Sequence, residues 1–363
     1  MVYLDQAATS FPKLEEVKQA VMSAFDVAGN ANRSSNMDSS RLIFEARRNI
    51  AQFFGLSDFH RVILNGGNTE SLNTCIKGIL KEKDHVITTY AEHNSVLRPL
   101  YELEEKGIIT LTICAPYLED IKNHIQNNTR MVIMTHSSNV TGEIFDVDLI
   151  GQYCKECGVL FMVDAAQSAG HIPVSMENID VLCFSGHKGL LGIGGIGGFC
   201  VKDMEVKTLI SGGTGIDSFN PQMPKAYPEH LEAGTQNIVG IAALNAGIQY
   251  VQSHQKEIVE KECFLLQKLY EGLSGYVEFY SSLENSTPIV AINIPGKDSA
   301  YVSDLLNYKY GIVTRCGAHC APLMHKHLKT EERGIVRLSI SFQNTIEDID
   351  FVVRAIQKIS NDY

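Results

Sequence analysis

The pattern that most constrains the fold is an alternation of short apolar segments with helical segments over the first half of the chain. The segments between the apolar runs, such as TESLNTCIKGILKE and NSVLRPLYELEEK, have the spacing of helices. Buried strands that alternate with helices predict an α/β fold with a doubly wound, mainly parallel sheet, whose ligands bind at the carboxyl ends of the strands. The predicted strands are HRVILN (60–65), DHVITTY (84–90), GIITLTI (107–113), TRMVIMTH (129–136), GVLFMVD (158–164) and DVLCFS (180–185).

The chain changes character after residues 212–230, which are rich in glycine and proline. A long helical pattern at 237–273 leads into two strand-like segments, PIVAINI (288–294) and GIVRLSI (334–340), and a final helix follows them. This order predicts a second, smaller α+β domain. We expect a large domain at residues 13–240, and a small domain formed by residues 1–12 together with residues 241–363.

Composition narrows the classes of partner. The formal net charge of −11 argues against nucleic acid and anionic membranes, both of which favour basic surfaces. We find neither a signal-peptide pattern at the N-terminus nor an apolar run of membrane-spanning length. The nine cysteines are scattered through the chain, a pattern typical of reduced thiols, so we expect a cytoplasmic protein.

Lys188 lies in FSGHKGLLGIGGIGG (184–198), where a strand pattern runs into a glycine-rich segment. The literal G-x-G-x-x-G at 192–197 lacks the context of a dinucleotide-binding motif, because a strand-like segment rather than a helix follows it. A lysine in such a turn is usually a solvated residue, but Asp164 ends a buried strand and needs a cationic partner there. Pyridoxal 5'-phosphate (PLP), which is held by a lysine and an aspartate, supplies one in its pyridine nitrogen.

A phosphate site is predicted at GGNTESLNTC (66–75), a glycine turn that opens a helix. Backbone N–H groups and the helix dipole favour a phosphate at such a turn, and Thr69 lies in the first helical turn. Ser185 and His187 flank the lysine and offer further donors. A plain helix cap is the alternative interpretation of Asn68 or Thr69.

Residues 314–328, TRCGAHCAPLMHKHL, concentrate cysteine and histidine in one short segment. The residues alone leave two interpretations open, a metal-binding or redox module and a loop that carries one nucleophilic thiol. The C-x-x-C of Cys154 and Cys157 is a weaker candidate of the same kind, because it falls at the end of a helical pattern. The candidate ligands of the first interpretation are Cys316, His319, Cys320, His325 and His327.

As an ordered set, these motifs resemble those of the class V aminotransferase fold group. VDAAQ and FSGHKG, with NGGNTE and THSSNVTGE upstream and EAGTQNIVG downstream, are similar to those of the cysteine desulfurases and selenocysteine lyases within that group. The segment RCGAHCAP resembles the short active-site loop of the SufS-like branch. The resemblance runs from YLDQAAT (3–9) to RLSISFQNT (337–345). It implies the PLP-dependent transferase fold type I and a homodimer.

The resemblance also implies how PLP is held. Lys188 would bind the cofactor covalently and move protons at the substrate Cα, and Asp164 would pair with the pyridine nitrogen. His93 would stack on the ring and shuttle a proton. The remaining cofactor contacts would come from Asn139 and Gln167 near the ring, from Thr69, Ser185 and His187 at the phosphate, and from Thr235 of a second subunit.

Substrate residues are implied in the same way. Arg337 would hold the substrate carboxylate, a task that favours arginine over lysine, with Asn139 on the same side. Cys320 would be the nucleophile that accepts sulfur. Arg315 would also face the substrate, and together with His319 it would favour the thiolate form of Cys320. No metal is expected in this site.

The implied reaction converts L-cysteine to L-alanine and leaves a persulfide on Cys320 for transfer to an acceptor protein. L-selenocysteine is an alternative substrate, and another class V activity such as transamination is an alternative reaction. Two features depart from the family pattern: Asn32 and Asn36 stand where SufS-like relatives have histidines, and Cys316 has no assigned role. We expect His325 and His327 on the surface of the helix that follows the loop.

Overall fold

The structure is a computed structural model that describes residues 1–27, 29 and 37–362. Asn32 and Asn36, the two departures from the family histidines, therefore lie outside the described residues. The predicted alternation of strands and helices is confirmed. The first part of the chain forms β1 (Val2–Tyr3), α1 (Glu15–Ala24), α2 (Asp38–Phe54), β2 (Val62–Asn65), α3 (Asn68–Ile79), β3 (Asp84–Thr89), α4 (Asn94–Glu105), β4 (Ile109–Cys114), α5 (Leu118–His124), β5 (Thr129–Thr135), α6 (Val147–Glu156), β6 (Leu160–Asp164), β7 (Val181–Ser185) and β8 (Gly197–Val201).

These strands form a seven-stranded sheet in the order β2-β8-β7-β6-β5-β3-β4. All neighbours pair in parallel except at β8, which runs antiparallel to both β7 and β2. The direction in which the chain adds strands reverses between β3 and β5, because β4 joins outside β3 and β5 joins on its other side. Such a switch point opens a crevice at the carboxyl ends of the strands, and this is where open α/β sheets bind their ligands.

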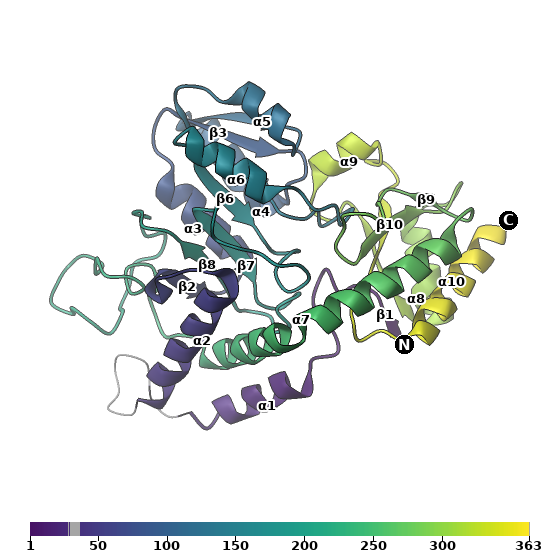
Figure 1. Cartoon of the computed structure of the whole chain (residues 1–363), viewed down its shortest axis with the longest axis horizontal. Helices are drawn as coiled ribbons and strands as arrows, with labels where there is room; N and C mark the ends of the chain where they lie inside the picture. The colour runs from purple at the N-terminus through teal and green to yellow at the C-terminus, as the bar shows by residue number, and fades with distance from the viewer. Residues whose placement is uncertain (28, 30–36, 363) are drawn as a thin grey trace.

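Both faces of this sheet are covered. Every residue of β7 and β8 is buried, as a strand with helices on both faces requires. Two apolar clusters, one on each face, alternate along the strands: Leu182 and Phe184 belong to one, and Val181 and Cys183 to the other. Figure 1 shows the helices α3 to α6 around the sheet, with α2 and α7 beneath it.

The second part of the chain forms a smaller lobe around an antiparallel sheet of order β12-β13-β10-β9. The N-terminal strand β1 joins this lobe by pairing in parallel with β11, and Leu4 lies in its core. The expected large and small domains therefore both have a sheet of their own, while the boundaries of the division stay a prediction. The elements are α7 (Ile238–Leu273), β9 (Glu278–Phe279), β10 (Ile289–Asn293), α8 (Ser299–Tyr310), β11 (Ile312–Val313), β12 (Arg315–Gly317), α9 (Pro322–Leu328), β13 (Ile335–Ser339) and α10 (Ile346–Asn361).

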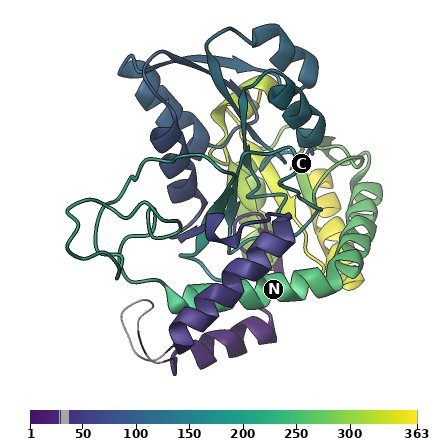
Figure 2. The ribbon, with the colours of Figure 1, turned by 60° about the vertical axis from the view of Figure 1, so that its left-hand side comes forward.

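Helix α7 connects the two lobes as one continuous rod, as Figures 1 and 2 show. Its first half contributes Ile241 and Leu244 to the core of the large sheet. Its second half contributes Leu265 and Leu269 to the core of the smaller lobe. Helix α7 thus packs against the cores of both lobes.

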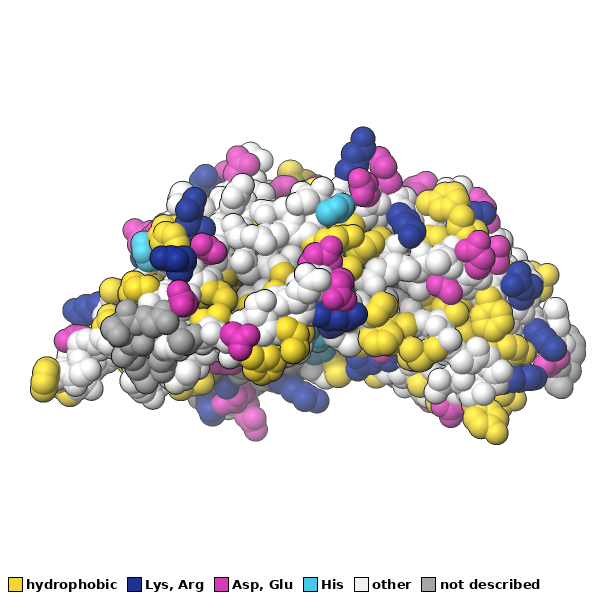
Figure 3. Space-filling view, turned by 90° about the horizontal axis from the view of Figure 1, so that it is seen from below, with side chains coloured by type: hydrophobic (Ala, Val, Ile, Leu, Met, Phe, Trp, Pro, Cys, Tyr) yellow, Lys and Arg dark blue, Asp and Glu magenta, His cyan; other side chains and the backbone are white. Residues whose placement is uncertain are grey.

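The surface in Figure 3 intermixes acidic, basic and hydrophobic side chains. Within the described part of the chain, no helix is both long and apolar enough to cross a membrane. All nine cysteines are free thiols.

Candidate active site

A cavity of about 610 Å3 opens at the carboxyl ends of the large sheet. Each predicted cofactor residue on its wall lies at the end of a strand or in the segment that follows one, which is where the sequence analysis expected a ligand to bind. The wall includes eight of the predicted residues, namely Thr69, His93, Asn139, Asp164, Gln167, Ser185, His187 and Lys188.

Asp164 ends β6 and is 4% exposed. Its Oδ1 accepts hydrogen bonds from Asn68 Nδ2 at 2.8 Å and from the backbone N–H of Ala166 at 2.9 Å. Both donors are neutral, and a buried carboxylate is stabilised far better by a cationic partner. The carboxylate therefore suits a ligand that brings a protonated nitrogen to the cavity.

Lys188 lies on the cavity wall, in the turn after β7. Burial lowers its pKa to about 8, while the charge of Asp164 opposes that shift. The turn is held from outside, because the N–H of Ser10 and the ammonium of Lys13 both donate to the carbonyl oxygen of His187. A lysine with a lowered pKa and a fixed backbone is suited to react with an aldehyde.

The start of α3 lines the cavity beside Lys188. Gly67 has a φ of 146°, and a Cβ on the neighbouring Gly197 would lie 2.8 Å from the Gly67 Cα, so this close backbone approach requires glycine. The backbone N–H groups of the first turn of α3, together with Thr69, form a helix N-terminus that can bind an anion.

His93 caps α4 and is joined to Thr69 through Ser95. Ser95 Oγ lies 2.8 Å from His93 Nδ1 and 2.9 Å from Thr69 Oγ1, and the Ser95 N–H donates to the same Nδ1. Burial lowers the His93 pKa to about 4. The imidazole is therefore neutral with its proton on Nε2, because Nδ1 accepts from a backbone N–H.

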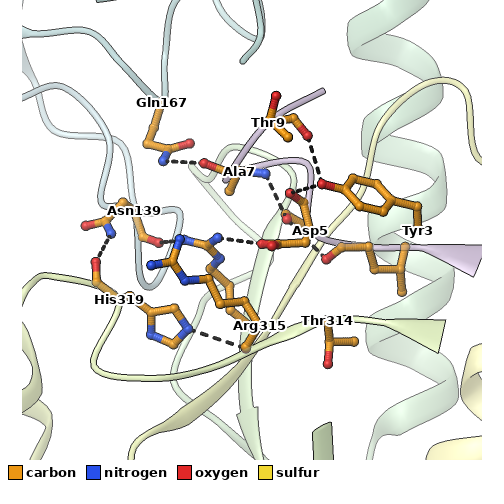
Figure 4. A network of polar contacts seen from close by, with 12 residues as sticks. Tyr3, Asp5, Ala7, Thr9, Asn139, Gln167, Thr314, Arg315 and His319 are labelled. Carbon is orange, nitrogen blue, oxygen red and sulfur yellow. Dashed lines mark hydrogen bonds and ion pairs between the residues drawn. The ribbon is translucent and has the colours of Figure 1, made fainter. Parts of the chain in front are cut away.

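Arg337 lies on β13 and is 1% exposed. Its Nη2 donates to Asp5 Oδ1 at 2.8 Å, and its Nη1 donates to the carbonyl oxygen of Asn139 at 2.9 Å. Arg315 is its direct cross-strand partner on β12, so two arginines stand side by side. Like charges in this position repel, and an anionic ligand relieves that repulsion. Figure 4 shows Asp5, Asn139 and Arg315, which come from three distant parts of the chain, within this network of polar contacts.

Cys320 lies in the turn between β12 and α9 and is exposed. Its carbonyl oxygen accepts from the N–H of Asn94 at 2.7 Å, and the carbonyl oxygen of His319 accepts from Asn139 Nδ2 at 2.7 Å. Both bonds join the smaller lobe to residues at the edge of the large sheet. The thiol-bearing turn is thus seated next to His93 and Asn139, which line the cavity.

Two expectations for this segment are wrong. His319 carries no charge, because burial and then the nearby Arg337 lower its pKa to about 2, so it does not favour a thiolate electrostatically. His325 is buried at 1% exposure instead of lying on the helix surface, because its ring packs parallel to that of His319. His327 is exposed as expected, and its ring stacks on Tyr90.

The metal-module interpretation of residues 316–327 finds little support in the geometry. Both ring nitrogens of His325 already have partners, Thr330 Oγ1 at 2.8 Å and His319 Nδ1 at 3.4 Å. Among the described residues, no group of three or more histidine, cysteine or acidic side chains is arranged to hold a metal ion.

Other predicted residues lie off the cavity wall. Thr235 is exposed and is not on the wall, and Arg315, Arg337 and Cys320 approach from the smaller lobe. Sequence reasoning missed Asn68 on Asp164, Ser95 on His93 and Asp5 on Arg337. Only the position of Asn68 beside Thr69 carried a signal; Asp5 and Arg337 are 332 positions apart.

A lysine of lowered pKa, a buried carboxylate and a helix N-terminus around one cavity fit the aldehyde, the pyridine nitrogen and the phosphate of PLP. Together with the mainly parallel sheet and the smaller lobe, they define a PLP-dependent enzyme of fold type I.

Comparisons with known proteins give the family. The model of the family "Aminotransferase class-V" matches residues 2–352. The chain is 31% identical, over 99% of its length and 94% of the relative's, to a "Probable cysteine desulfurase" of Methanothermobacter thermautotrophicus. It is 30% identical to cysteine desulfurase CsdA of Escherichia coli, over 98% of this chain and 93% of CsdA. The chain therefore belongs to the aminotransferase class-V family.

A solved structure agrees with this assignment. The apo structure of cysteine desulfurase from Thermococcus onnurineus has a TM-score of 0.92 to this chain at 29% identity, covering 100% of this chain and 95% of that one. The finer placement in the SufS-like branch stays a prediction.

Proposed function

We propose that this protein is a cysteine desulfurase that converts L-cysteine to L-alanine and holds the sulfur as a persulfide on Cys320. The observation that carries the proposal is the seating of the exposed Cys320 turn on Asn94 and Asn139, at the mouth of a cavity lined by Lys188 and Asp164. The names of the similar proteins point to the same activity.

The cofactor would be held by residues already in place around the cavity. Lys188 would bind it covalently, Asp164 would hold the pyridine nitrogen, and His93 would lie against the ring. When bound, PLP withdraws electrons from the substrate Cα and so makes its proton removable. The phosphate would lie at the start of α3 against Thr69, with Ser185 and His187 beside it, and Asn139 and Gln167 would face the ring and substrate.

The chain's own residues then carry the reaction. Arg337 and Arg315 hold the substrate carboxylate, and Lys188 Nζ, neutral above a pKa of about 8, removes the proton from the substrate Cα. Cys320 Sγ attacks the substrate sulfur, so that an S–S bond forms and the Cβ–S bond breaks. The electron pair of the broken bond stays with the substrate carbon, which takes up a proton, and alanine leaves.

The test is Cys320→Ser followed by mass spectrometry after addition of L-cysteine. The wild-type protein should gain one sulfur atom on Cys320, and the variant should bind PLP normally and gain none. The matched control is Cys316→Ser, four residues earlier in the chain, which should still form the persulfide. Unchanged alanine and sulfide production by Cys320→Ser would contradict the proposal.

A second experiment distinguishes L-cysteine from L-selenocysteine as the substrate. With L-selenocysteine, the weaker C–Se bond makes a nucleophilic thiol less necessary. A desulfurase should therefore lose alanine release from L-cysteine in Cys320→Ala, and a selenocysteine lyase should retain release from L-selenocysteine. We propose a protein acceptor for the sulfur and a reducing cytosolic location, which nine free thiols support.

We also propose that the active unit is a homodimer in which Thr235 completes the phosphate site of the partner. Thr235 is exposed, lies off the cavity wall, and belongs to a long segment that also exposes Ile210 and Phe219. Coexpression of Lys188→Ala with Thr235→Ala tests this, because a mixed dimer would contain one site with both wild-type residues. Activity of the mixture well above that of either variant alone supports the exchange, and activity equal to their average contradicts it.

A further inference from the structure

Two buried imidazoles lie behind the turn that carries Cys320. The rings of His319 and His325 are nearly parallel, with 15° between their planes and centroids 5.6 Å apart. They are 4% and 1% exposed, and Thr330 behind them is 2% exposed. A buried polar cluster of this kind is retained only where its hydrogen bonds are made, so the order of donors and acceptors needs to be worked out.

The direction of these hydrogen bonds follows from the acceptor at one end of the cluster, the carbonyl oxygen of Arg315. The carbonyl oxygen of Arg315 can only accept, so His319 Nε2, 3.4 Å away, carries the proton. His319 is neutral because burial lowers its pKa to about 2, and its Nδ1 therefore accepts from His325 Nε2 at 3.4 Å. The pKa of His325 is lowered by burial as well, so its Nδ1 accepts from the Thr330 hydroxyl at 2.8 Å.

The result is a relay of hydrogen bonds that all run in one direction. Thr330 donates to His325, His325 donates to His319, and His319 donates to the Arg315 carbonyl oxygen, so that both nitrogens of each ring are used. Thr330, at the start of the relay, is held by two backbone hydrogen bonds. Its N–H donates to the carbonyl oxygen of His325, and its carbonyl oxygen accepts from the N–H of Gly334. The relay thus ties the turn both to β12 before it and to the segment that leads into β13.

The turn needs such support because its backbone is strained. His319 and Cys320 have φ angles of 50° and 56°, two consecutive non-glycine residues in the left-handed region. This conformation is unfavourable for residues with a Cβ and persists only where surrounding contacts fix it. The N–H of Asn94 donates to the carbonyl oxygen of Cys320, and the side-chain amide of Asn139 donates to that of His319. The His319 ring holds the same turn through its contact with the Arg315 carbonyl oxygen.

We propose that His325 and Thr330 are positioning residues that, through His319, hold Cys320 at the angle needed to attack the substrate sulfur. The inference rests on the proposed function, since it concerns the same thiol. Neither residue touches the cavity wall, so the effect acts on the geometry of the turn and not on cofactor or substrate contacts.

The test compares two reactions of the same thiol in the PLP-bound enzyme. Persulfide formation on Cys320 in a single turnover with L-cysteine requires the correct angle, whereas alkylation of Cys320 by iodoacetamide requires only exposure. His325→Phe keeps the ring but removes both nitrogens, and Thr330→Val removes only the hydroxyl. Each should slow persulfide formation about tenfold or more while alkylation changes less than twofold.

Conservative variants separate positioning from general damage. His325→Gln, which retains a donor for His319, and Thr330→Ser, which retains the hydroxyl, should recover most of the persulfide rate. His327→Gln on the same helix should have no effect, because that ring is exposed. Persulfide rates equal to wild type in His325→Phe and Thr330→Val overturn the inference, as does a parallel loss of bound PLP or of alkylation. Absence of any persulfide on the wild-type enzyme overturns the proposed function and the inference with it.

Discussion

The two halves of this active site are built on different principles. The residues of the cofactor half lie at or just after the carboxyl ends of strands in the large sheet, and the topology of that sheet brings them together. The residues of the thiol half come from the smaller lobe and depend on hydrogen bonds to distant parts of the chain. The cofactor half consists of Thr69, His93, Asp164, Ser185, His187 and Lys188, and the thiol half of Arg315, Cys320 and Arg337.

The two kinds of construction respond differently to substitution. A sheet edge is a rigid frame, so a substitution in the cofactor half removes a chemical group without moving its neighbours. In the thiol half, position depends on a strained turn and on single contacts such as that between Arg337 and Asp5, so a substitution there moves the remaining groups. The two halves should therefore respond separately to substitution.

The largest effect is expected from Lys188→Ala. The variant has no amine at position 188 to bind PLP or to move the Cα proton of the substrate. Its production of L-alanine from L-cysteine should therefore fall at least about 1,000-fold. The protein should no longer carry the cofactor covalently after borohydride reduction, as the intact mass reports. Alkylation of Cys320 should remain at the wild-type rate, and a marked change in that rate would show that the halves are not independent.

Arg337→Lys tests the thiol half. Lysine cannot donate to both Asp5 and the carbonyl oxygen of Asn139, and it recognises a carboxylate less well, so KM for L-cysteine should rise about 10- to 100-fold. Covalent PLP content should stay unchanged. Arg333→Lys is the matched control, because Arg333 pairs with Glu278 at the surface and should leave KM unaltered. Loss of PLP from Arg337→Lys would contradict the separation of the two halves.

Sequence analysis could predict the cofactor half because its signals are local. Asp164 ends an apolar strand pattern, Lys188 follows another, and a glycine turn precedes Thr69, so the topology of a parallel sheet places them at one edge. The sequence indicated that a strand-like segment follows the glycine-rich run, but it did not give the antiparallel direction of that strand, β8, or the order of the strands in the sheet.

The thiol half could not be predicted to the same depth. The residues around His325 in the sequence do not distinguish it from a histidine on a helix surface. It is buried because its ring packs on that of His319 and hydrogen-bonds to Thr330. The charge expected on His319 was wrong for the same reason, because burial by distant residues removes it. Pairs such as Asp5 and Arg337 form only when the two ends of the chain meet.

The smallest effect is expected from Glu92→Gln, which tests the rigidity of the frame itself. Glu92 is fully buried beside the ends of β3 and β5, bonded to Thr89 Oγ1 at 2.6 Å and to the N–H of Thr135 at 3.0 Å. Burial raises its pKa from 4.5 to about 8, despite these two bonds. The folded protein thus keeps a proton that the unfolded chain releases, so this contribution to stability is complete below pH 4.5 and is lost as the pH rises through about 8.

Glutamine is neutral at every pH, so the variant should lose less stability than the wild type between pH 5 and pH 8. The difference in slope should approach, at most, about 1.4 kcal/mol per pH unit. Urea unfolding at pH 5, 6, 7 and 8 measures it, with the exposed Glu105→Gln as the control that should match the wild type. PLP content and the persulfide rate should both stay near wild type, because the frame carries the cofactor residues whether or not Glu92 is ionisable. A larger loss of the persulfide rate than of PLP would mean that the thiol half also depends on this buried carboxyl, and the comparison between the halves would fail at that point.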